Sequence, residues 1–243
     1  MSSSFKNKRV LVTGAGRGIG RAVVKELVSK EASVIALSKT KTNLDNLKKE
    51  FPSIEIVAVD VGNWKETEAA VQKLGAIDML VNNAGIITLQ EVGSITEDEV
   101  DECFSVNVKA VANISQIVAV NMKKAGIRGS IVNLSSQASM VGIPKHATYC
   151  ASKGAVDQLT KVFALELGPS GIRVNSVNPT VILTDMGKRA CGSGSLEEKK
   201  AAIPLGEFPE PEDVVKAVLF LLSEDSRMIT GAHLPIDGGY TCH

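Results

Sequence analysis

The stretch VLVTGAGRGIGRAVVKEL, residues 10–27, decides the fold. It joins an apolar, β-branched run to a helical pattern through a turn that carries glycines at positions 14, 18 and 20. Glycines allow a tight turn that approaches a phosphate closely, and the helix that follows presents free N–H groups and a favourable dipole. The stretch predicts a nucleotide-binding turn formed by Gly14, Arg17, Gly18, Ile19 and Gly20, with a purely structural turn as the alternative.

The same alternation of apolar runs and helical patterns continues along the chain. Apolar runs occupy 9–14, 33–38, 54–60, 78–85, 130–136, 172–179 and 232–239, and helical patterns lie near 18–30, 42–50, 64–74, 96–125, 148–167 and 211–223. Strands that are apolar on both faces are typical of a parallel sheet covered on both sides. The pattern predicts an α/β fold, a single-domain Rossmann-type doubly wound parallel sheet with helices on both faces, over residues 1–243.

One segment does not follow this alternation of apolar runs and helical patterns. Residues 184–213 mix glycines, prolines and charges after the carboxyl end of an expected strand, where α/β proteins bind ligands. We expect a substrate lid there, with a surface excursion as the alternative.

Composition limits the classes of function. Lys+Arg and Asp+Glu both total 27 in 243 residues, and this zero net charge argues against a nucleic-acid surface. The four cysteines are scattered and no leader precedes the first strand, which favours free thiols and a cytoplasmic location. No apolar run reaches the roughly 20 residues of a transmembrane segment. The three histidines share no ligand spacing, so no metal is expected.

The stretch SVIALSKTKT, residues 33–42, bears on the choice of cofactor. A strand in this position usually ends in an acid that binds the ribose hydroxyls of NAD, but here it ends in Ser38, Lys39 and Thr40. Arg17 and Lys39 would flank the ribose, and two charge-assisted hydrogen bonds to a 2′-phosphate would give a preference of about a hundredfold. The stretch predicts NADP(H), unless Lys39 only opens a solvated basic loop.

A candidate acid lies in the helical pattern 148–167. Tyr149 and Lys153 are four residues apart and share a helix face. An ammonium about 4 Å from the phenol could lower the tyrosine pKa from about 10 towards 7, which would make Tyr149 an effective general acid. Such a spacing alone is usually helix surface. Ser136 closes the preceding strand at the ligand-binding edge, where its hydroxyl could bond a substrate carbonyl.

These motifs together resemble the short-chain dehydrogenase/reductase family over essentially the whole chain. The resemblance rests on TGAGRGIG (13–20), Asp60, NNAG (82–85), Asn107, Ser136 and the Tyr149-x-x-x-Lys153 pair. It implies that Tyr149 is the general acid/base, that Lys153 tunes it and binds the nicotinamide ribose, and that Ser136 positions the carbonyl. It also implies that Asn107 holds a water in a proton relay.

The same resemblance implies further cofactor contacts. These are Asp60 and Val61 at the adenine, Asn83, Ala84 and Gly85 beside the adenosine ribose, and Ile182 and Thr184 at the carboxamide. Thr180 stands where the family usually has glycine, which leaves the backbone approach there open.

Three longer stretches resemble a narrower subgroup, the dicarbonyl/L-xylulose reductases. They are VNLSSQAS (132–139), residues 147–184 and TGAHLPIDGGY (230–240). The subgroup implies NADPH-dependent reduction of a small carbonyl substrate, a sugar ketose such as L-xylulose or an α-dicarbonyl such as diacetyl. It also implies a homotetramer and places Gln137 and His146 in the substrate pocket, near a lid that contains Cys191. The alternatives are a 3-oxoacyl, steroid or other carbonyl reductase of the family, and a non-enzymatic NADPH-binding scaffold or redox sensor.

Overall fold

The computed structural model describes residues 5–191 and 196–242, apart from the side chains at 190 and 191, and contains a seven-stranded sheet in the order β3-β2-β1-β4-β5-β6-β7. All neighbouring strands are parallel. The strands are β1 (Arg9–Thr13), β2 (Ser33–Ser38), β3 (Glu55–Ala58), β4 (Met79–Asn82), β5 (Ser130–Leu134), β6 (Arg173–Pro179) and β7 (His233–Ile236). The predicted α/β class and all seven predicted strands are confirmed.

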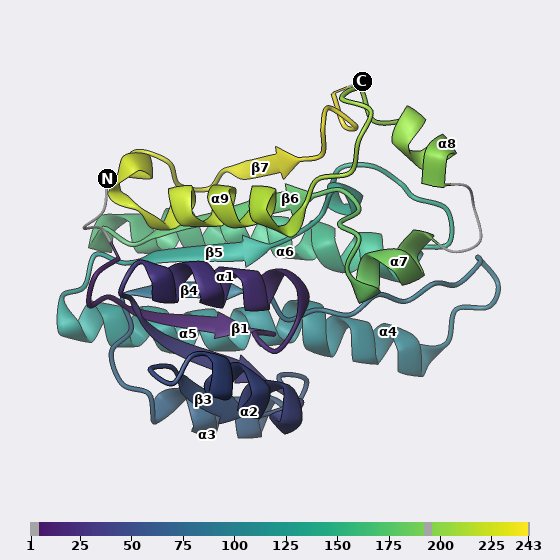
Figure 1. Cartoon of the computed structure of the whole chain (residues 1–243). Coiled ribbons are helices and arrows are strands. Elements are labelled where there is room, and N and C mark those ends of the chain that lie inside the picture. The colour runs from purple at the N-terminus through teal and green to yellow at the C-terminus, as the bar shows by residue number, and fades with distance from the viewer. Residues whose placement is uncertain (1–4, 192–195, 243) are drawn as a thin grey trace.

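Helices cover both faces of the sheet, with α1 and α9 in front of it and α5 and α6 behind it in Figure 1. The helices are α1 (Gly18–Ser29), α2 (Lys41–Glu50), α3 (Trp64–Gln72), α4 (Glu97–Phe104), α5 (Ala110–Ala125), α6 (Ala147–Leu167), α7 (Asp185–Cys191), α8 (Leu196–Ala201) and α9 (Pro211–Leu222). Short 3-10 turns at Gln137–Ser139, Gly168–Ser170 and Glu224–Ser226 complete the regular elements.

Alternate side chains of each inner strand enter two separate hydrophobic cores. In β1, Val10 and Val12 pack with α1, α2 and α9, whereas Leu11 packs with α3, α5 and α6. Because successive side chains point to opposite faces of a strand, a sheet buried on both sides needs apolar residues at every position. This is the physical reason for the continuous apolar runs in the sequence.

The predicted helix over 96–125 is interrupted. A π-helical turn at Ser105–Lys109 separates α4 from α5, and buried Asn107 lies within it. Such turns occur mostly as single inserted turns at functional sites. The expectation of one continuous helix is therefore corrected, because an inserted turn leaves the apolar pattern almost unchanged.

The helical segment Glu97–Ala125 is also the one stretch, among the described residues, that is long and apolar enough to span a membrane by length and composition, with a mean hydropathy of 1.4 in its 18-residue window. Half of that window is buried inside the protein, and the α5 portion of the segment packs against α3 and supplies Ile114 and Val118 to a core. A core helix meets the same criterion, and the packing assigns this segment to the core.

The carboxyl ends of the central strands meet at one edge of the sheet, on the right in Figure 1, beside α4 and α7. The glycine turn follows β1, residues 83–87 follow β4, Ser136 follows β5, and residues 180–187 follow β6. The sheet thus brings together segments that are separated by more than 150 residues.

Candidate active site

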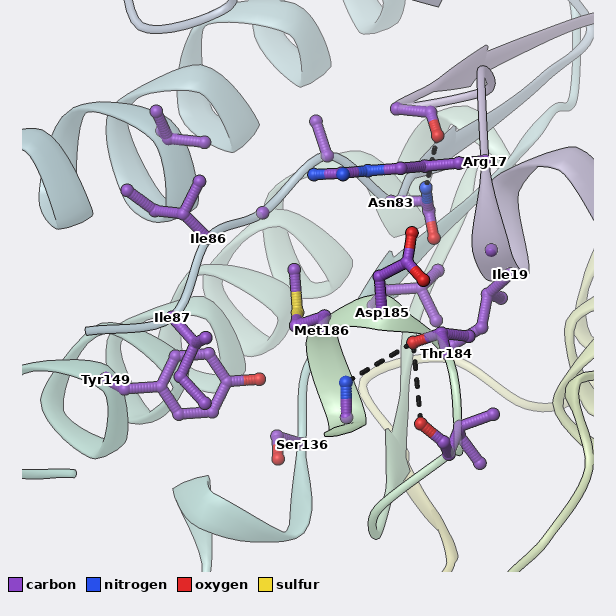
Figure 2. A pocket seen from close by; sticks show the side chains of 18 of the residues that line it. Arg17, Ile19, Asn83, Ile86, Ile87, Ser136, Tyr149, Thr184, Asp185 and Met186 are labelled. Atoms are coloured by element: carbon purple, nitrogen blue, oxygen red, sulfur yellow. Dashed lines mark hydrogen bonds between the residues drawn. The ribbon is translucent and has the colours of Figure 1, made fainter. Parts of the chain in front are cut away.

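A cavity of about 590 Å³ lies at this edge of the sheet. Its lining includes nearly all of the predicted site residues: Gly14, Arg17, Gly18, Ile19, Ser38, Lys39, Thr40, Asp60, Val61, Asn83, Ala84, Gly85, Ser136, Gln137, His146, Tyr149, Lys153, Ile182 and Thr184. Gly20 and Asn107 do not line it. Figure 2 shows Arg17 on one side of the cavity and Tyr149 on the other, with Met186 between them.

The glycine turn forms the part of the cavity wall that suits a pyrophosphate. Gly14 and Gly18 have φ values of +63° and +54°, a region that favours glycine. The helix α1 begins at Gly18 without a side-chain cap, so its first N–H groups are available to an anion at the cavity wall. A Cβ on Gly20 would lie 2.5 Å from the carbonyl oxygen of Gly14, so Gly20 supports the turn from behind.

The Asn83–Gly85 segment is bound to this turn. The Asn83 side chain donates hydrogen bonds to the carbonyls of Thr13 (2.9 Å) and Gly14 (3.1 Å). The backbone N–H groups of Asn83 and Ala84 both donate to the Thr13 hydroxyl at 3.0 Å. The Asn83 amide therefore positions the glycine turn.

A group of charged residues, which we call the cation end, lies at the end of β2 and comprises Arg17, Lys39 and Asp60. The Lys39 ammonium lies 2.7 Å from the Asp60 carboxylate although the Lys39 side chain is 74% exposed. The hydrogen bond and charge of Asp60 raise the pKa of Lys39. No hydrogen bond or ion pair of the Arg17 guanidinium occurs within the part of the chain that the structure describes. The two predicted cations thus line the same cavity, but one of them already has an anionic partner.

The opposite group, which we call the tyrosine end, comprises Ser136, Tyr149 and Lys153. The Lys153 ammonium donates a hydrogen bond to the carbonyl of Leu134 (2.7 Å) and lies 5.6 Å from the centre of the Tyr149 ring. Ser136 and Lys153 are 8% and 5% exposed. The structure thus brings the three side chains together, as the spacing predicts.

The pKa of Tyr149 moves in the direction opposite to our expectation. Burial raises the pKa of Tyr149 to about 12, although a hydrogen bond with Ser136 partly lowers it. Burial also lowers the pKa of Lys153 to about 8. The prediction of a lowered tyrosine pKa is wrong for this structure, because removing the phenol from water outweighs an ammonium that is directed to a backbone carbonyl.

Asn107 lies behind the cavity wall. Its side chain exchanges two hydrogen bonds with the backbone of Ile86 (2.8 and 3.0 Å) and donates to Ser152 (3.0 Å), whose hydroxyl donates to the carbonyl of Tyr149 (2.7 Å). The π-helical turn therefore connects two walls of the cavity. The proton-relay role implied by the resemblance stays a prediction.

Two hydrogen-bond acceptors lie near the tyrosine end. The Nδ1 atom of His146 is 2.7 Å from the carbonyl of Pro144. Because a carbonyl only accepts, Nδ1 carries a proton, and in the neutral ring Nε2 is then the acceptor. The buried Oε1 atom of Gln137 has no hydrogen-bond partner among the described residues. Both residues line the cavity, but the Oε1 atom of Gln137 is itself buried, so a ligand would reach it only after the side chain turns towards the cavity.

Sequence reasoning missed several residues of the cavity wall. They are Asn43, Gly62, Ile86, Ile87, Glu102, Ser105, Val106, Leu134, Ser135, Ile143, Pro179 and Val181. Ile86 and Ile87 directly follow NNAG and could have been included. Glu102 has no local signal, because only the tertiary fold brings α4 close to the end of β2.

The predicted lid contributes Thr184, Asp185, Met186 and Gly187 to the cavity wall, and Figure 2 shows three of these side chains. The Cys191 side chain and residues 192–195 lie outside the described part, so the effect of Cys191 on pocket shape is untested. No group of three His, Cys, Asp or Glu residues that could hold a metal occurs in residues 5–191 and 196–242.

Comparisons with known proteins agree with this geometry. The family model described as enoyl-(acyl carrier protein) reductase matches residues 14–241. The chain is 51% identical to L-xylulose reductase from Homo sapiens over 242 residues, 99% of each chain. It is 50% identical to D-erythrulose reductase from Gallus gallus, over 98% of this chain and 97% of that one. It is 46% identical to carbonyl reductase (NADPH) 2 from Sus scrofa, over 99% of each.

Solved structures show the same fold with nicotinamide cofactors. A 4-hydroxyisoleucine dehydrogenase complexed with NADH has a TM-score of 0.93 at 33% identity, covering 98% of this chain and 100% of that one. A gluconate 5-dehydrogenase from Burkholderia cenocepacia J2315, in complex with NADP and tartrate, has a TM-score of 0.93 at 29% identity, covering 100% and 98%. The family match and these full-length similarities show that the chain belongs to the short-chain dehydrogenase/reductase family of oxidoreductases.

Proposed function

We propose that this protein is an NADPH-dependent carbonyl reductase that converts hydroxylated ketones, L-xylulose among them, to alcohols, and reduces small α-dicarbonyls such as diacetyl less well. One observation carries the proposal: the hydroxyls of Ser136 and Tyr149 and the ammonium of Lys153 meet in the cavity whose other wall is the glycine turn. The full-length similarity to L-xylulose and D-erythrulose reductases supports the substrate class.

The residues of the tyrosine end would perform the proton chemistry. When bound, the nicotinamide cofactor supplies a hydride to the carbonyl carbon. Ser136 donates a hydrogen bond to the carbonyl oxygen and stabilises the negative charge that develops there. Tyr149 donates its proton to the same oxygen. Its raised pKa suits this direction, because the phenol is protonated at neutral pH before each turnover.

Lys153 supports this proton transfer. Its ammonium lies beside the Tyr149 ring and stabilises the phenolate that remains after the proton has left. The same group would bond the nicotinamide ribose hydroxyls. The hydrogen bond to the Leu134 carbonyl holds the ammonium in this place.

The acceptors of the cavity favour a ketose over a diketone. Nε2 of the neutral His146 ring can accept a hydrogen bond from a substrate hydroxyl, and the buried Oε1 of Gln137 can do so once its side chain turns towards the substrate. A ketose offers such donors beside its carbonyl, whereas a diketone offers none and leaves a buried acceptor unpaired.

The cation end supports NADPH. β2 ends in Ser38, Lys39 and Thr40, and no acid stands there to repel a 2′-phosphate. Arg17 and Lys39 line the same wall. Because Asp60 pairs with Lys39, we expect a preference below the hundredfold that two free cations would give.

Steady-state assays with NADPH and with NADH test this function, using L-xylulose, diacetyl and a 3-oxoacyl thioester as substrates. We expect turnover with NADPH in the order L-xylulose, diacetyl, thioester, and weak turnover with NADH. If only the thioester is turned over, the substrate is a 3-oxoacyl thioester and the assignment to a ketose is wrong. Tight NADPH binding without turnover of any carbonyl would point to a scaffold or sensor.

We further propose that the protein forms a homotetramer in the cytoplasm. Exposed apolar side chains on the outer faces of α5 and α6, such as Val120 (47%), Val162 (49%) and Leu165 (78%), support a self-association surface. Light scattering after size-exclusion chromatography measures the mass, and Leu165→Glu is expected to lower it. A monomeric wild-type protein would contradict the assembly, and cell fractionation tests the location.

A further inference from the structure

A buried polar cluster lies behind the tyrosine end and joins α6, β6 and β7. It consists of Asp157, Ser176, Asn178 and His233, none of which lines the cavity. Asp157, Ser176 and Asn178 are 8%, 0% and 0% exposed. Asp157 follows Lys153 by one turn of α6. The proposed reaction leaves this cluster unused.

Both oxygens of the Asp157 carboxylate are held within the cluster. Oδ2 accepts a hydrogen bond from the Asn178 amide (2.9 Å), and Oδ1 lies 3.1 Å from the Ser176 hydroxyl and 3.4 Å from Nδ1 of His233. Nδ1 of His233 is also 2.7 Å from the Ser176 hydroxyl. Ser176 has one proton and faces two oxygens that only accept, on Asp157 and Asn178, so His233 donates to Ser176. The carboxylate therefore has a fixed orientation.

The Asn178 amide connects this carboxylate to the segment that carries Ser136. Its two protons serve three acceptors, namely Asp157 and the Ser139 hydroxyl (2.9 Å each) and, as the longer arm of a shared hydrogen bond, the Ser136 carbonyl (3.3 Å). The Ser139 hydroxyl in turn donates to the Ser136 carbonyl (2.7 Å). The 3-10 turn Gln137–Ser139 is thus held at its beginning and its end, and it carries Gln137 as well.

We propose that Asp157 is a positioning residue for carbonyl reduction, which acts through Asn178 to fix the backbone of Ser136 and thereby the direction of its hydroxyl. The inference rests on the proposed function, because it assumes that Ser136 orients the carbonyl. Asp157 does not line the cavity, so its effect on the direction of Ser136 passes through Asn178, whereas its charge acts directly on Lys153. A misplacement of about 1 Å in a positioning element can lower turnover about a hundredfold.

The charge of Asp157 provides an independent readout. The groups that act on Lys153 are Asp157 on its own helix and Cys103 on α4, with the Tyr149 ring beside its ammonium. Around Asp157 itself lie His233 on β7 and Lys161 on α6, which acts on His233. A neutral side chain at 157 removes the nearby negative charge. The pKa of Lys153 then falls, and the alkaline limb of the kcat/KM profile moves to lower pH.

Four variants test the inference in assays with L-xylulose and NADPH. Asp157→Ala and Asn178→Ala are expected to lower kcat about tenfold to a hundredfold, while NADPH affinity, followed by its fluorescence, changes less than twofold. Asp157→Asn can still accept the Asn178 hydrogen bond, so it should keep most of kcat but shift the alkaline limb. Asn178→Ala should leave the alkaline limb of the profile at the wild-type pH. The control Glu166→Gln removes an exposed carboxylate from the same helix and should change neither quantity.

Several outcomes would overturn the inference. A folded Asp157→Ala protein whose kcat stays within twofold of wild type would do so. Equal losses in Asp157→Asn and Asp157→Ala with an unmoved pH profile would indicate a merely structural residue. If Asp157→Ala does not fold, Asp157→Asn and Asn178→Ala decide the question. A wild-type protein that reduces no carbonyl would instead overturn the proposed function.

Discussion

The two ends of the cavity are built differently. At the tyrosine end, Ser136 and Lys153 are 8% and 5% exposed, and buried hydrogen bonds hold the Ser136 hydroxyl and the Lys153 ammonium. At the cation end, the Lys39 side chain is 74% exposed and its one ion pair joins it to Asp60. The fold therefore completes the tyrosine end by itself, whereas the cation end keeps side chains that can change partner when a ligand arrives.

This difference sets the size of the effects that we expect. A buried polar group that loses its partner carries the full cost of desolvation, whereas exposed ion pairs contribute little and are screened by salt. Single changes at the tyrosine end should thus alter turnover and stability strongly. Changes at the cation end should only adjust the preference between two cofactors.

The largest effect is expected for Tyr149→Phe. The variant lacks the proton donor but keeps the ring, so kcat for L-xylulose should fall about 10²- to 10⁴-fold while NADPH affinity stays within twofold. Stopped-flow or steady-state absorbance measures the former and NADPH fluorescence the latter. The other tyrosine of the chain supplies the control, because Tyr240→Phe lies outside the cavity and should keep full activity. Normal turnover in Tyr149→Phe would remove the proposed acid.

Lys153→Met should abolish activity and raise the free energy of unfolding. Burial lowers the pKa of Lys153 from 10.5 to about 8, so keeping the charge at pH 7 costs the cofactor-free protein about 3 kcal/mol. The neutral variant should therefore be inactive and more stable by up to about 3 kcal/mol in urea unfolding at pH 7. The loss of the Leu134 hydrogen bond reduces this gain.

The stability difference between the wild-type protein and Lys153→Met should depend on pH. Between pH 8 and 10.5 the unfolded chain binds the lysine proton that the folded protein has released, so wild-type stability rises with pH relative to the variant. The stability gap should be largest below pH 8 and vanish above 10.5. The control Lys161→Met, an exposed lysine of the same helix, should show no such gap. A Lys153→Met protein less stable than wild type at pH 7 would mean that the buried charge is well compensated.

The sequence predicts which residues form the tyrosine end, but not the burial that sets their pKa values. The spacing of Tyr149 and Lys153, and the place of Ser136 after β5, follow from strand and helix periodicity alone. The pKa of Tyr149 depends on how many groups surround the phenol, which no local pattern records. The same holds for Asn107, whose π-helical turn leaves the apolar periodicity of its helix unchanged.

At the cation end the sequence predicts the composition and misses the pairing. The residues after β2 and the missing acid are visible directly in the sequence, and Arg17 and Lys39 both line the cavity as expected. The partner of Lys39 is Asp60, which follows the next strand, β3. Only the parallel pairing of β2 with β3 brings the two side chains within 2.7 Å.

Arg17→Gln tests the free cation of this end. The guanidinium can form charge-assisted bonds to a 2′-phosphate, so kcat/KM with NADPH should fall about tenfold while the value with NADH changes little. Lys41→Gln is the control, because Lys41 is paired with Asp45 and does not line the cavity. An equal loss with both cofactors would place Arg17 at a group that they share, such as the pyrophosphate.

The smallest effect, and the sharpest test of the cation end, is expected for Asp60→Asn. An asparagine keeps an oxygen that accepts the hydrogen bond from the Gly62 N–H (3.0 Å) but no longer neutralises Lys39. The freed ammonium should raise the ratio of kcat/KM for NADPH over NADH about twofold to fivefold, the range typical of an exposed ion pair. This gain should shrink in high salt.

The ratio isolates Lys39, because any contact of residue 60 with the adenine affects both cofactors equally. Asp45→Asn makes the same chemical change at the pair with Lys41 and should leave the ratio unchanged. A lower ratio in Asp60→Asn would mean that Asp60 orients Lys39 towards the phosphate and does not compete for it. The cation end would then be preorganised like the tyrosine end, and the difference between the two ends would be one of exposure alone.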